Sequence, residues 1–280
     1  MAAGRFAAQT KKNFAGTICV SGTVHEECFE GVAPREVTKR VKPDFVIVGE
    51  ATATSIKIGQ RGRAEVVVET EGVSCHSSNP EKGVNAVYGM MAVIEEIRKI
   101  VPNEHPLLGR GILELTDIVS APYPGASVVP AACRATFDRR TLVGEDEAVI
   151  LGQVEEAIAR AQEKHPEIKA RCYLATGTEA CWTGDTISAK RYFPAWVVDE
   201  NSELVVKARR GLEAAGIDAP LSHFSFCTNG SHFCGEAGIP TIGYGPSLES
   251  LAHVRDEYIE ISQLTKACRG FASILAELTR

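Results

Sequence analysis

Several features that mark membrane, secreted and nucleic-acid-binding proteins are missing from this 280-residue sequence. No apolar run approaches the roughly 20 residues that a membrane-spanning helix needs. The N-terminal stretch MAAGRFAAQTKKNFAG lacks the hydrophobic segment of a secretory signal. The formal net charge of −6 leaves no basic excess to neutralise phosphates. We therefore expect neither a membrane nor a nucleic acid as a partner.

Paired cysteine motifs are also missing. The nine cysteines are scattered singly, without a CxxC pair, and their number is odd. Such usage favours reduced thiols in a cytoplasmic protein over a disulfide scaffold. We interpret these cysteines as small buried side chains.

The outer parts of the chain alternate between β-rich runs and helical patterns. TICVSGT and PDFVIVGEAT are expected strands, and the segment PREVTKRV between them is an expected helix with Pro34 in its first turn. Further along, SELVVKARRGLEAAG is predicted to be a helix that begins at Asn201 or Ser202 and stops at Gly216. HFSFC and IPTIGYG are expected strands, and ISQLTKACRGFASILAELT is an expected closing helix. This alternation predicts an α/β domain with a mostly parallel sheet and flanking helices.

The middle of the chain follows another order. A strand at RAEVVVETEG, a helix at GVNAVYGMMAVIEEIRKIV, two strands at GILELTDIVSA and AACRATFDRR, a helix at EDEAVILGQVEEAIARAQ and a strand at EIKARCYLAT are expected. This β-α-β-β-α-β order is that of a ferredoxin-like unit. We therefore expect a catalytic domain formed by residues 1–57 and 174–280, interrupted by an inserted domain at residues 58–173. The two chain crossings would form a hinge.

Acidic and imidazole side chains recur where the expected strands end. Glu26 and Glu27 follow the first strand and Glu50 ends the second, while His253 lies in LAHVRDE and His76 in GVSCHSSNPEKGVNA. Carboxylates and imidazoles suit zinc, and α/β folds gather their sites at strand ends. Each residue alone is a weak signal, because a single histidine in a loop is more often solvated and Glu50 alone could be an ordinary strand-end acid.

Taken together, five segments resemble a known family in the family's own order: HEECFEG, VGEAT, HSSNPEKGVNA, FDRRTLVGE and GYGPSLESLAHVRDEY. The family is that of the two-metal amidohydrolases, which includes aminoacylase, acetylornithine deacetylase, succinyl-diaminopimelate desuccinylase and the glutamate carboxypeptidases. The sequence most resembles the branch of hydrolases linked to selenium metabolism. The resemblance covers essentially the whole chain. It implies a metal-dependent hydrolase that cleaves an amide or peptide bond of a small N-acyl amino acid or peptide with a free carboxylate.

The resemblance also implies roles for the strand-end residues. Glu26 would be the general base, taking a proton from a metal-bound water and passing it to the leaving amine. Glu27 and His253 would ligate one metal ion, and Glu50 would ligate the second. The metal would be zinc, with cobalt or manganese as alternatives.

The remaining roles concern the substrate and the second subunit. His76, on the inserted domain, would donate to the oxyanion across a homodimer interface formed by that domain. Arg140 would hold the substrate carboxylate, and the loop at Asn229, Gly230 and Ser231 would add backbone donors. Arg140 pairing with an acid on the surface of the inserted domain remains an equal alternative.

One part of the family pattern is missing. The His-x-Asp of the family, whose histidine is a ligand, occurs nowhere in the 280 residues, and the bridging aspartate that follows it has no counterpart. Glu27, Glu50 and His253 are too few ligands for two zinc ions. We therefore expect a truncated form, missing two metal ligands, that binds zinc poorly and is inactive by itself. The alternative is a non-catalytic dimerising or ligand-binding protein derived from the family.

Overall fold

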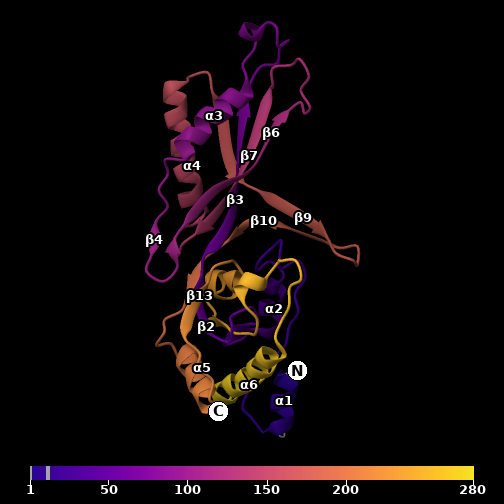
Figure 1. Ribbon diagram of the computed structural model, residues 1–280, viewed down its shortest axis with the longest axis vertical. Coiled ribbons are helices and arrows are strands. Elements are labelled where there is room, and N and C mark those ends of the chain that lie inside the picture. Colours follow the sequence, from indigo (N-terminus) through magenta and orange to yellow (C-terminus); the bar gives the residue numbers. More distant parts are fainter. Residues whose placement is uncertain (1, 11–12) are drawn as a thin grey trace. The chain divides into compact units, whose positions relative to one another are not determined.

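The computed structural model describes residues 2–10 and 13–280, which fold into two compact units (Figure 1). Unit 1 consists of residues 1–62, 106–108 and 193–280, and unit 2 of residues 63–105 and 109–192. By compactness, unit 2 extends to Tyr192, beyond the end expected at residue 173. The division into 1–57, 58–173 and 174–280 stays a prediction. Among the described residues, no helix combines the length and apolar character needed to cross a membrane.

A five-stranded mixed sheet forms the centre of unit 1. Its strands are β1 (Val46–Val48), β2 (Ile56–Gln60), β12 (Trp196–Val197), β13 (Leu221–Phe224) and β14 (Thr241–Gly243). The pairs β1–β14 and β2–β13 are parallel, whereas β2 pairs antiparallel with both β12 and β14. The α/β class is thus confirmed, but the prediction of a mostly parallel sheet is wrong. The reason is β2, which we did not predict and which runs antiparallel to two of its neighbours.

Strand β2 escapes prediction because its sequence, IKIGQ, is partly polar. All five residues are nevertheless buried. Lys57 donates to the carbonyl of His223 at 3.0 Å and pairs with Glu249 at 2.8 Å. The Gln60 carboxamide accepts from the Thr228 hydroxyl at 2.6 Å. Polar groups that are satisfied in this way can occupy the centre of a sheet.

The expected first strand, TICVSGT, is not a strand in the structure. Residues 17–23 pair with no other segment as a strand, and Val20 is 83% exposed. Without burial on either face, the β-propensity of this run has nothing to pack against.

Helices cover the sheet of unit 1. They are α1 (Ala2–Gln9), α2 (Pro34–Val41), α5 (Glu203–Ala214) and α6 (Ile261–Leu278), with a π-helical turn η2 (Ser231–Glu236) and a short 3-10 turn η3 (Glu249–Leu251). Helices α2, α5 and α6 are the predicted ones. Gly211 lets α5 approach α6 closely, because a Cβ there would lie 2.5 Å from the Ser273 carbonyl. Figure 1 shows the resulting pair near the C-terminus, with α6 in yellow.

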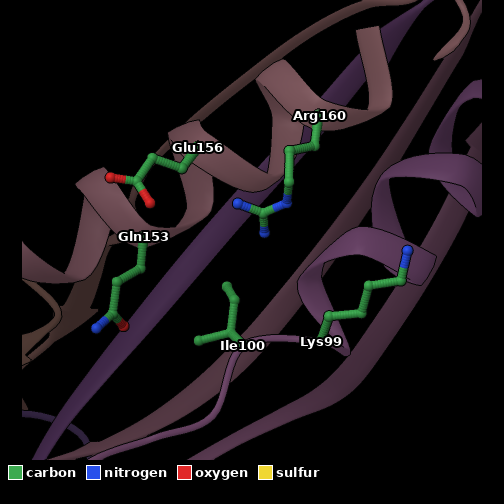
Figure 2. Close-up of a pocket in the computed structure, with 5 residues that line it drawn as sticks. All are labelled: Lys99, Ile100, Gln153, Glu156 and Arg160. Atoms are coloured by element: carbon green, nitrogen blue, oxygen red, sulfur yellow. The ribbon is translucent and has the colours of Figure 1, made fainter. Parts of the chain in front are cut away.

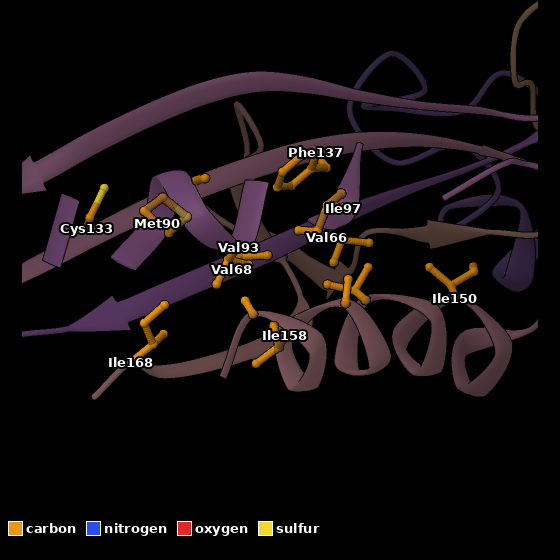
Figure 3. Close-up of a cluster of buried hydrophobic side chains, with 14 of the residues drawn as sticks. Val66, Val68, Met90, Val93, Ile97, Cys133, Phe137, Ile150, Ile158 and Ile168 are labelled. Carbon is orange, nitrogen blue, oxygen red and sulfur yellow. The ribbon is translucent and has the colours of Figure 1, made fainter. Parts of the chain in front are cut away.

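Unit 2 contains the predicted β-α-β-β-α-β order. Its elements are β3 (Gly62–Glu71), α3 (Ala86–Ile97), β6 (Ile112–Ala121), β7 (Ala132–Thr141), α4 (Glu147–Lys164) and β8 (Lys169–Leu174). The sheet runs β6-β7-β3, with β8 and the short β11 (Tyr192–Phe193) both pairing with β3. Figure 3 shows the apolar core between sheet and helices, where Val66, Val68, Met90 and Ile158 meet. Smaller elements are the turn η1 (Pro80–Lys82), the pair β4 (Glu104–His105) and β5 (Gly109–Arg110), and the hairpin β9 (Thr176–Ala180) and β10 (Thr186–Lys190).

Strand β6 lies at the edge of this sheet and carries exposed apolar side chains. Ile118 is 46% and Val119 is 43% exposed, and on α3 Tyr88 is 70% and Met91 is 54% exposed. An open sheet edge and apolar side chains left in water are the features of a surface that another chain covers.

Candidate functional site

The two adjacent glutamates of the HEECFEG segment, Glu26 and Glu27, lie in a tight loop of unit 1, residues 23–31, which we name the Glu26 loop. His25 adopts a left-handed conformation with φ of +52°, and the Phe29 N–H donates to its carbonyl at 2.9 Å. The Phe29 side chain is fully buried. At the end of the loop, Gly31 has φ of +96°, and a Cβ there would lie 2.9 Å from His232. The loop is therefore anchored at its centre and closed by a glycine that no other residue replaces without strain.

The side chains of Glu26 and Glu50 lie where a negative charge on the carboxylate is unfavourable. Burial, followed by the charges of Glu50, Glu30 and Glu27, raises the pKa of Glu26 to about 8. Burial, followed by the charge of Glu27, raises the pKa of Glu50 to about 7. One oxygen of Glu26, Oε1, is buried and has no hydrogen-bond partner. Crowded carboxylates of this kind take up a proton or a cation.

Glu27 lies beside His253, the residue predicted to share its metal ion. The distance between Glu27 Oε2 and His253 Nε2 is 3.4 Å, and the two side chains are 74% and 75% exposed. His253 has φ of +61°, and its N–H donates to Glu257 at 3.1 Å. The structure thus brings together two predicted ligands from opposite ends of the chain. Their role as zinc ligands stays a prediction.

The residues present supply only part of a zinc site. Carboxylate and imidazole donors suit zinc, and the unpartnered oxygen of Glu26 lies in the same loop as Glu27. Within residues 2–10 and 13–280, however, no group of three His, Cys, Asp or Glu side chains is gathered closely enough to hold a metal ion. A catalytic zinc generally has three protein ligands. The donor chemistry fits zinc, whereas the number of donors does not.

The predicted substrate loop is engaged within the protein. The Asn229 amide accepts from the Gly31 N–H and donates to the Thr23 hydroxyl, both at 3.0 Å. The Gly230 N–H donates to the Thr228 hydroxyl at 3.0 Å, and the buried Ser231 hydroxyl donates to the Pro194 carbonyl at 2.9 Å. Of the three backbone donors expected to face a substrate carboxylate, the Gly230 N–H is thus engaged, and so is the Ser231 N–H, which donates to the Thr228 carbonyl at 3.0 Å. The substrate role of the loop stays a prediction.

His76 and Arg140 belong to unit 2. The exposed His76 ring accepts at Nδ1 from the Ser78 N–H at 3.1 Å. Arg140 donates from Nε to Asp138 at 2.8 Å, and this is the pairing we left open as its alternative role. Their predicted parts as oxyanion donor and carboxylate holder stay predictions.

A pocket of about 320 Å³ in unit 2 contains none of the predicted site residues. Its lining comes from the segment directly after α3 and from α4, and consists of Lys99, Ile100, Gln153, Glu156 and Arg160 (Figure 2). Glu96, next to the pocket, bonds Lys99 at 2.7 Å and Arg160 at 3.3 Å. The cations that border the pocket are thus already paired.

Sequence reasoning missed the polar contacts between α2 and the turn η2. His232 bonds Glu236 at 2.7 Å and the Thr38 hydroxyl at 3.0 Å, and Arg35 bonds Glu236 at 3.0 Å. The hydrogen bonds from His232 and Arg35 lower the pKa of Glu236 to about 2, against the opposing effect of burial. No local signal links residues so distant along the chain, so spacing alone does not reveal this cluster.

Comparisons with known proteins agree with this arrangement. A model of the M20 peptidase dimerisation domain matches residues 58–166. The protein YgeY of Escherichia coli (strain K12) is 31% identical over 263 residues, which are 92% of this chain and 64% of YgeY. The chain belongs to the M20 peptidase family. Its inserted domain is therefore the dimerisation domain of that family.

Other relatives extend the likeness. The acetylornithine deacetylase of Buchnera aphidicola subsp. Schizaphis graminum is 24% identical over 259 residues, 90% of this chain and 62% of that protein. The crystal structure of aminopeptidase PepT from Bacillus cereus has the same fold, with a TM-score of 0.75 at 18% identity, over 100% of this chain and 69% of PepT. The chain thus spans 64% and 62% of the lengths of the two curated relatives.

Proposed function

We propose that this protein takes part in metal-dependent hydrolysis of an amide or peptide bond in a small N-acyl amino acid or peptide with a free carboxylate. The observation that carries this proposal is the crowding of Glu26, Glu27 and Glu50 next to His253 on one side of unit 1. Membership of a family of deacylases and peptidases supports it. The described residues gather no group of three possible metal ligands, so a complete metal site would need further ligands.

Glu26 is the proposed base. In the metal-free protein its pKa is about 8, within the range in which a carboxylate both accepts and returns a proton near neutral pH. Its unpartnered Oε1 is the atom on which the proton would be held. Zinc in the completed site would supply Lewis acidity, lowering the pKa of a water molecule and polarising the scissile carbonyl.

In this proposal Glu27 and His253 bind one metal ion, and Glu50 binds the second. Zinc is favoured over cobalt or manganese. Arg140 and the loop at Asn229, Gly230 and Ser231 are the proposed contacts of the substrate carboxylate, and His76 is the proposed oxyanion donor. The edge strand β6 (Ile112–Ala121) and the exposed side of α3 (Ala86–Ile97) support a homodimer. The cysteine usage of the sequence, scattered singly and without a CxxC pair, supports a cytoplasmic location.

A non-catalytic role is the second candidate. It is favoured by the absence of any three-residue metal group among the described residues. In that case the dimerisation domain and the Arg140 region would bind a carboxylate ligand without hydrolysing it.

The deciding experiment measures hydrolysis of a panel of N-acyl amino acids and dipeptides by a zinc-supplemented form of the protein that contains the two metal ligands expected to be missing, and by the Glu26→Gln variant of that form. Loss of a general base costs about 10²- to 10⁴-fold in turnover. The matched control is Glu200→Gln, which removes an exposed carboxylate elsewhere in unit 1 and leaves turnover unchanged. A Glu26→Gln variant with near-normal kcat refutes the assignment of the base. Saturable carboxylate binding without turnover in any variant supports the non-catalytic role.

A further inference from the structure

The carboxamide of Asn229 spans the Glu26 loop. Its oxygen accepts from the Gly31 N–H at the end of the loop, and its nitrogen donates to the Thr23 hydroxyl at the start, each at 3.0 Å. One side chain thus ties together the two ends of the segment that carries Glu26 and Glu27. The backbone of Asn229 also acts on Glu26 directly, since it lowers the pKa of that carboxyl against the larger effect of burial.

The backbone of Asn229 is itself held rigidly by its neighbours. The Gln60 carboxamide, fully buried in the sheet, accepts from the Thr228 N–H at 3.1 Å and from its hydroxyl at 2.6 Å. Gly230 is packed against the Trp196 ring, since a Cβ there would lie 2.5 Å from the indole nitrogen. Asn229 therefore projects from a segment fixed to β2 and is suited to impose its position on the loop.

A second set of contacts aligns the segments that flank this bridge. His232, three residues after Asn229, lies against Gly31 and bonds the Thr38 hydroxyl of α2 at 3.0 Å. Glu236 bonds Arg35 at 3.0 Å. The turn η2 (Ser231–Glu236) and helix α2 (Pro34–Val41) are thereby joined just beyond the loop, so the loop is fixed relative to the sheet at both its ends.

We propose that Asn229 is a positioning residue, which holds the Glu26 loop in the geometry needed for Glu26 and Glu27 to act. The proposal rests on the hydrolytic function proposed above, and it differs from the substrate-binding role expected from the sequence. The Asn229 amide oxygen and one of its two N–H groups already bond the loop, which leaves a single side-chain N–H for any substrate carboxylate.

Hydrogen exchange of the Gly31 amide tests the bridge directly and needs no substrate, because that N–H donates to Asn229. In Asn229→Ala we expect Gly31 to exchange about tenfold faster, the effect of one lost hydrogen bond. Thr23→Val removes only the other end of the bridge and should leave Gly31 protected. The matched control is Asn201→Ala, an asparagine exposed in unit 1 whose amide bonds only Asp199. Unchanged exchange at Gly31 in Asn229→Ala overturns the proposal.

Kinetics separate positioning from substrate binding. In the hydrolytically active protein we expect Asn229→Ala to lower kcat about 10²-fold with KM unchanged, because misplaced catalytic groups slow the chemical step. Thr23→Val should lower kcat in the same direction, whereas Thr23→Ser, which keeps the hydroxyl, should restore it. A raised KM with unchanged kcat in Asn229→Ala overturns positioning in favour of substrate binding. These kinetics need a form of the protein that contains the missing metal ligands, because the 280-residue chain is expected to be inactive by itself. Absence of turnover in that form counts against the hydrolytic proposal alone, since the exchange experiment still decides whether Asn229 fixes the loop.

Discussion

Glu26→Gln should stabilise the metal-free protein at alkaline pH. The pKa of Glu26 is raised from 4.5 to about 8 by burial and by Glu50, Glu30 and Glu27. Below pH 4.5 the carboxyl is protonated in both folded and unfolded chains, so it has no effect on stability. As the pH rises from 4.5 to about 8, the unfolded chain loses this proton while the folded chain keeps it. The free energy of unfolding therefore falls across this range and levels off above it.

The size of the effect follows from the same values. At about 1.4 kcal/mol per pKa unit, the rise from 4.5 to about 8 corresponds to roughly 5 kcal/mol once Glu26 is ionised. Because Glu26 is only partly buried and water screens part of the repulsion, we expect about 2 kcal/mol. Glutamine has nearly the same shape and no charge, so Glu26→Gln should recover this amount at pH 9 and less at pH 6.

Urea unfolding in the presence of EDTA measures this difference. Trp196, which is 2% exposed in unit 1, reports on the relevant unit, whereas Trp182 is 93% exposed and should change little on unfolding. Glu200→Gln is the control and should stay within about 0.5 kcal/mol of the wild type. A Glu26→Gln protein no more stable than the wild type at pH 9, or one whose gain is the same at pH 6, would refute the account of Glu26.

Two further predictions concern unit 2. Arg139 and Glu145 form a buried pair 2.9 Å apart, and removing one partner should cost about 3–5 kcal/mol of unfolding free energy. Glu145→Ala should therefore unfold at a markedly lower urea concentration than the exposed control Glu163→Ala. Equal urea midpoints for the two variants would contradict a structural role for the pair. Met91→Lys places a charge on the exposed side of α3 and should shift the protein from dimer to monomer in light scattering at micromolar concentration. The matched control Val206→Lys, at an exposed position of α5 in unit 1, should leave the mass unchanged. A wild-type protein that is already monomeric would remove the basis for a homodimer.

The sequence was sufficient to predict the helices and strands with clear hydrophobic periodicity, and to select candidate site residues within recognisable motifs. Helices α2, α5 and α6 and the β-α-β-β-α-β order of unit 2 follow from hydrophobic pattern and helix-stop signals. The proximity of Glu27 and His253 was expected from the family resemblance, although nothing local links the two residues.

The rest depended on tertiary contacts. Lys57 and Gln60 make the sequence of strand β2 partly polar, so it was not predicted as a strand. Both side chains can be buried because the folded chain supplies hydrogen-bond partners at His223 and Thr228. The β-rich segment TICVSGT has the composition of a strand, but in the folded chain no neighbouring segment pairs with it or buries it. The bridging role of Asn229 could not be predicted either, because its partners Gly31 and Thr23 lie about two hundred residues earlier in the sequence.

Zinc binding tests the central claim most directly, namely that this chain contributes the pair Glu27 and His253 to a metal centre that it does not complete. Isothermal titration of the dialysed protein with zinc should show weak binding that is abolished by combining Glu27→Ala with His253→Ala. The control is a protein in which His165, exposed in unit 2, is replaced by alanine. Two tightly bound zinc ions per chain, retained after both substitutions, would contradict the account and place the metal on residues other than these.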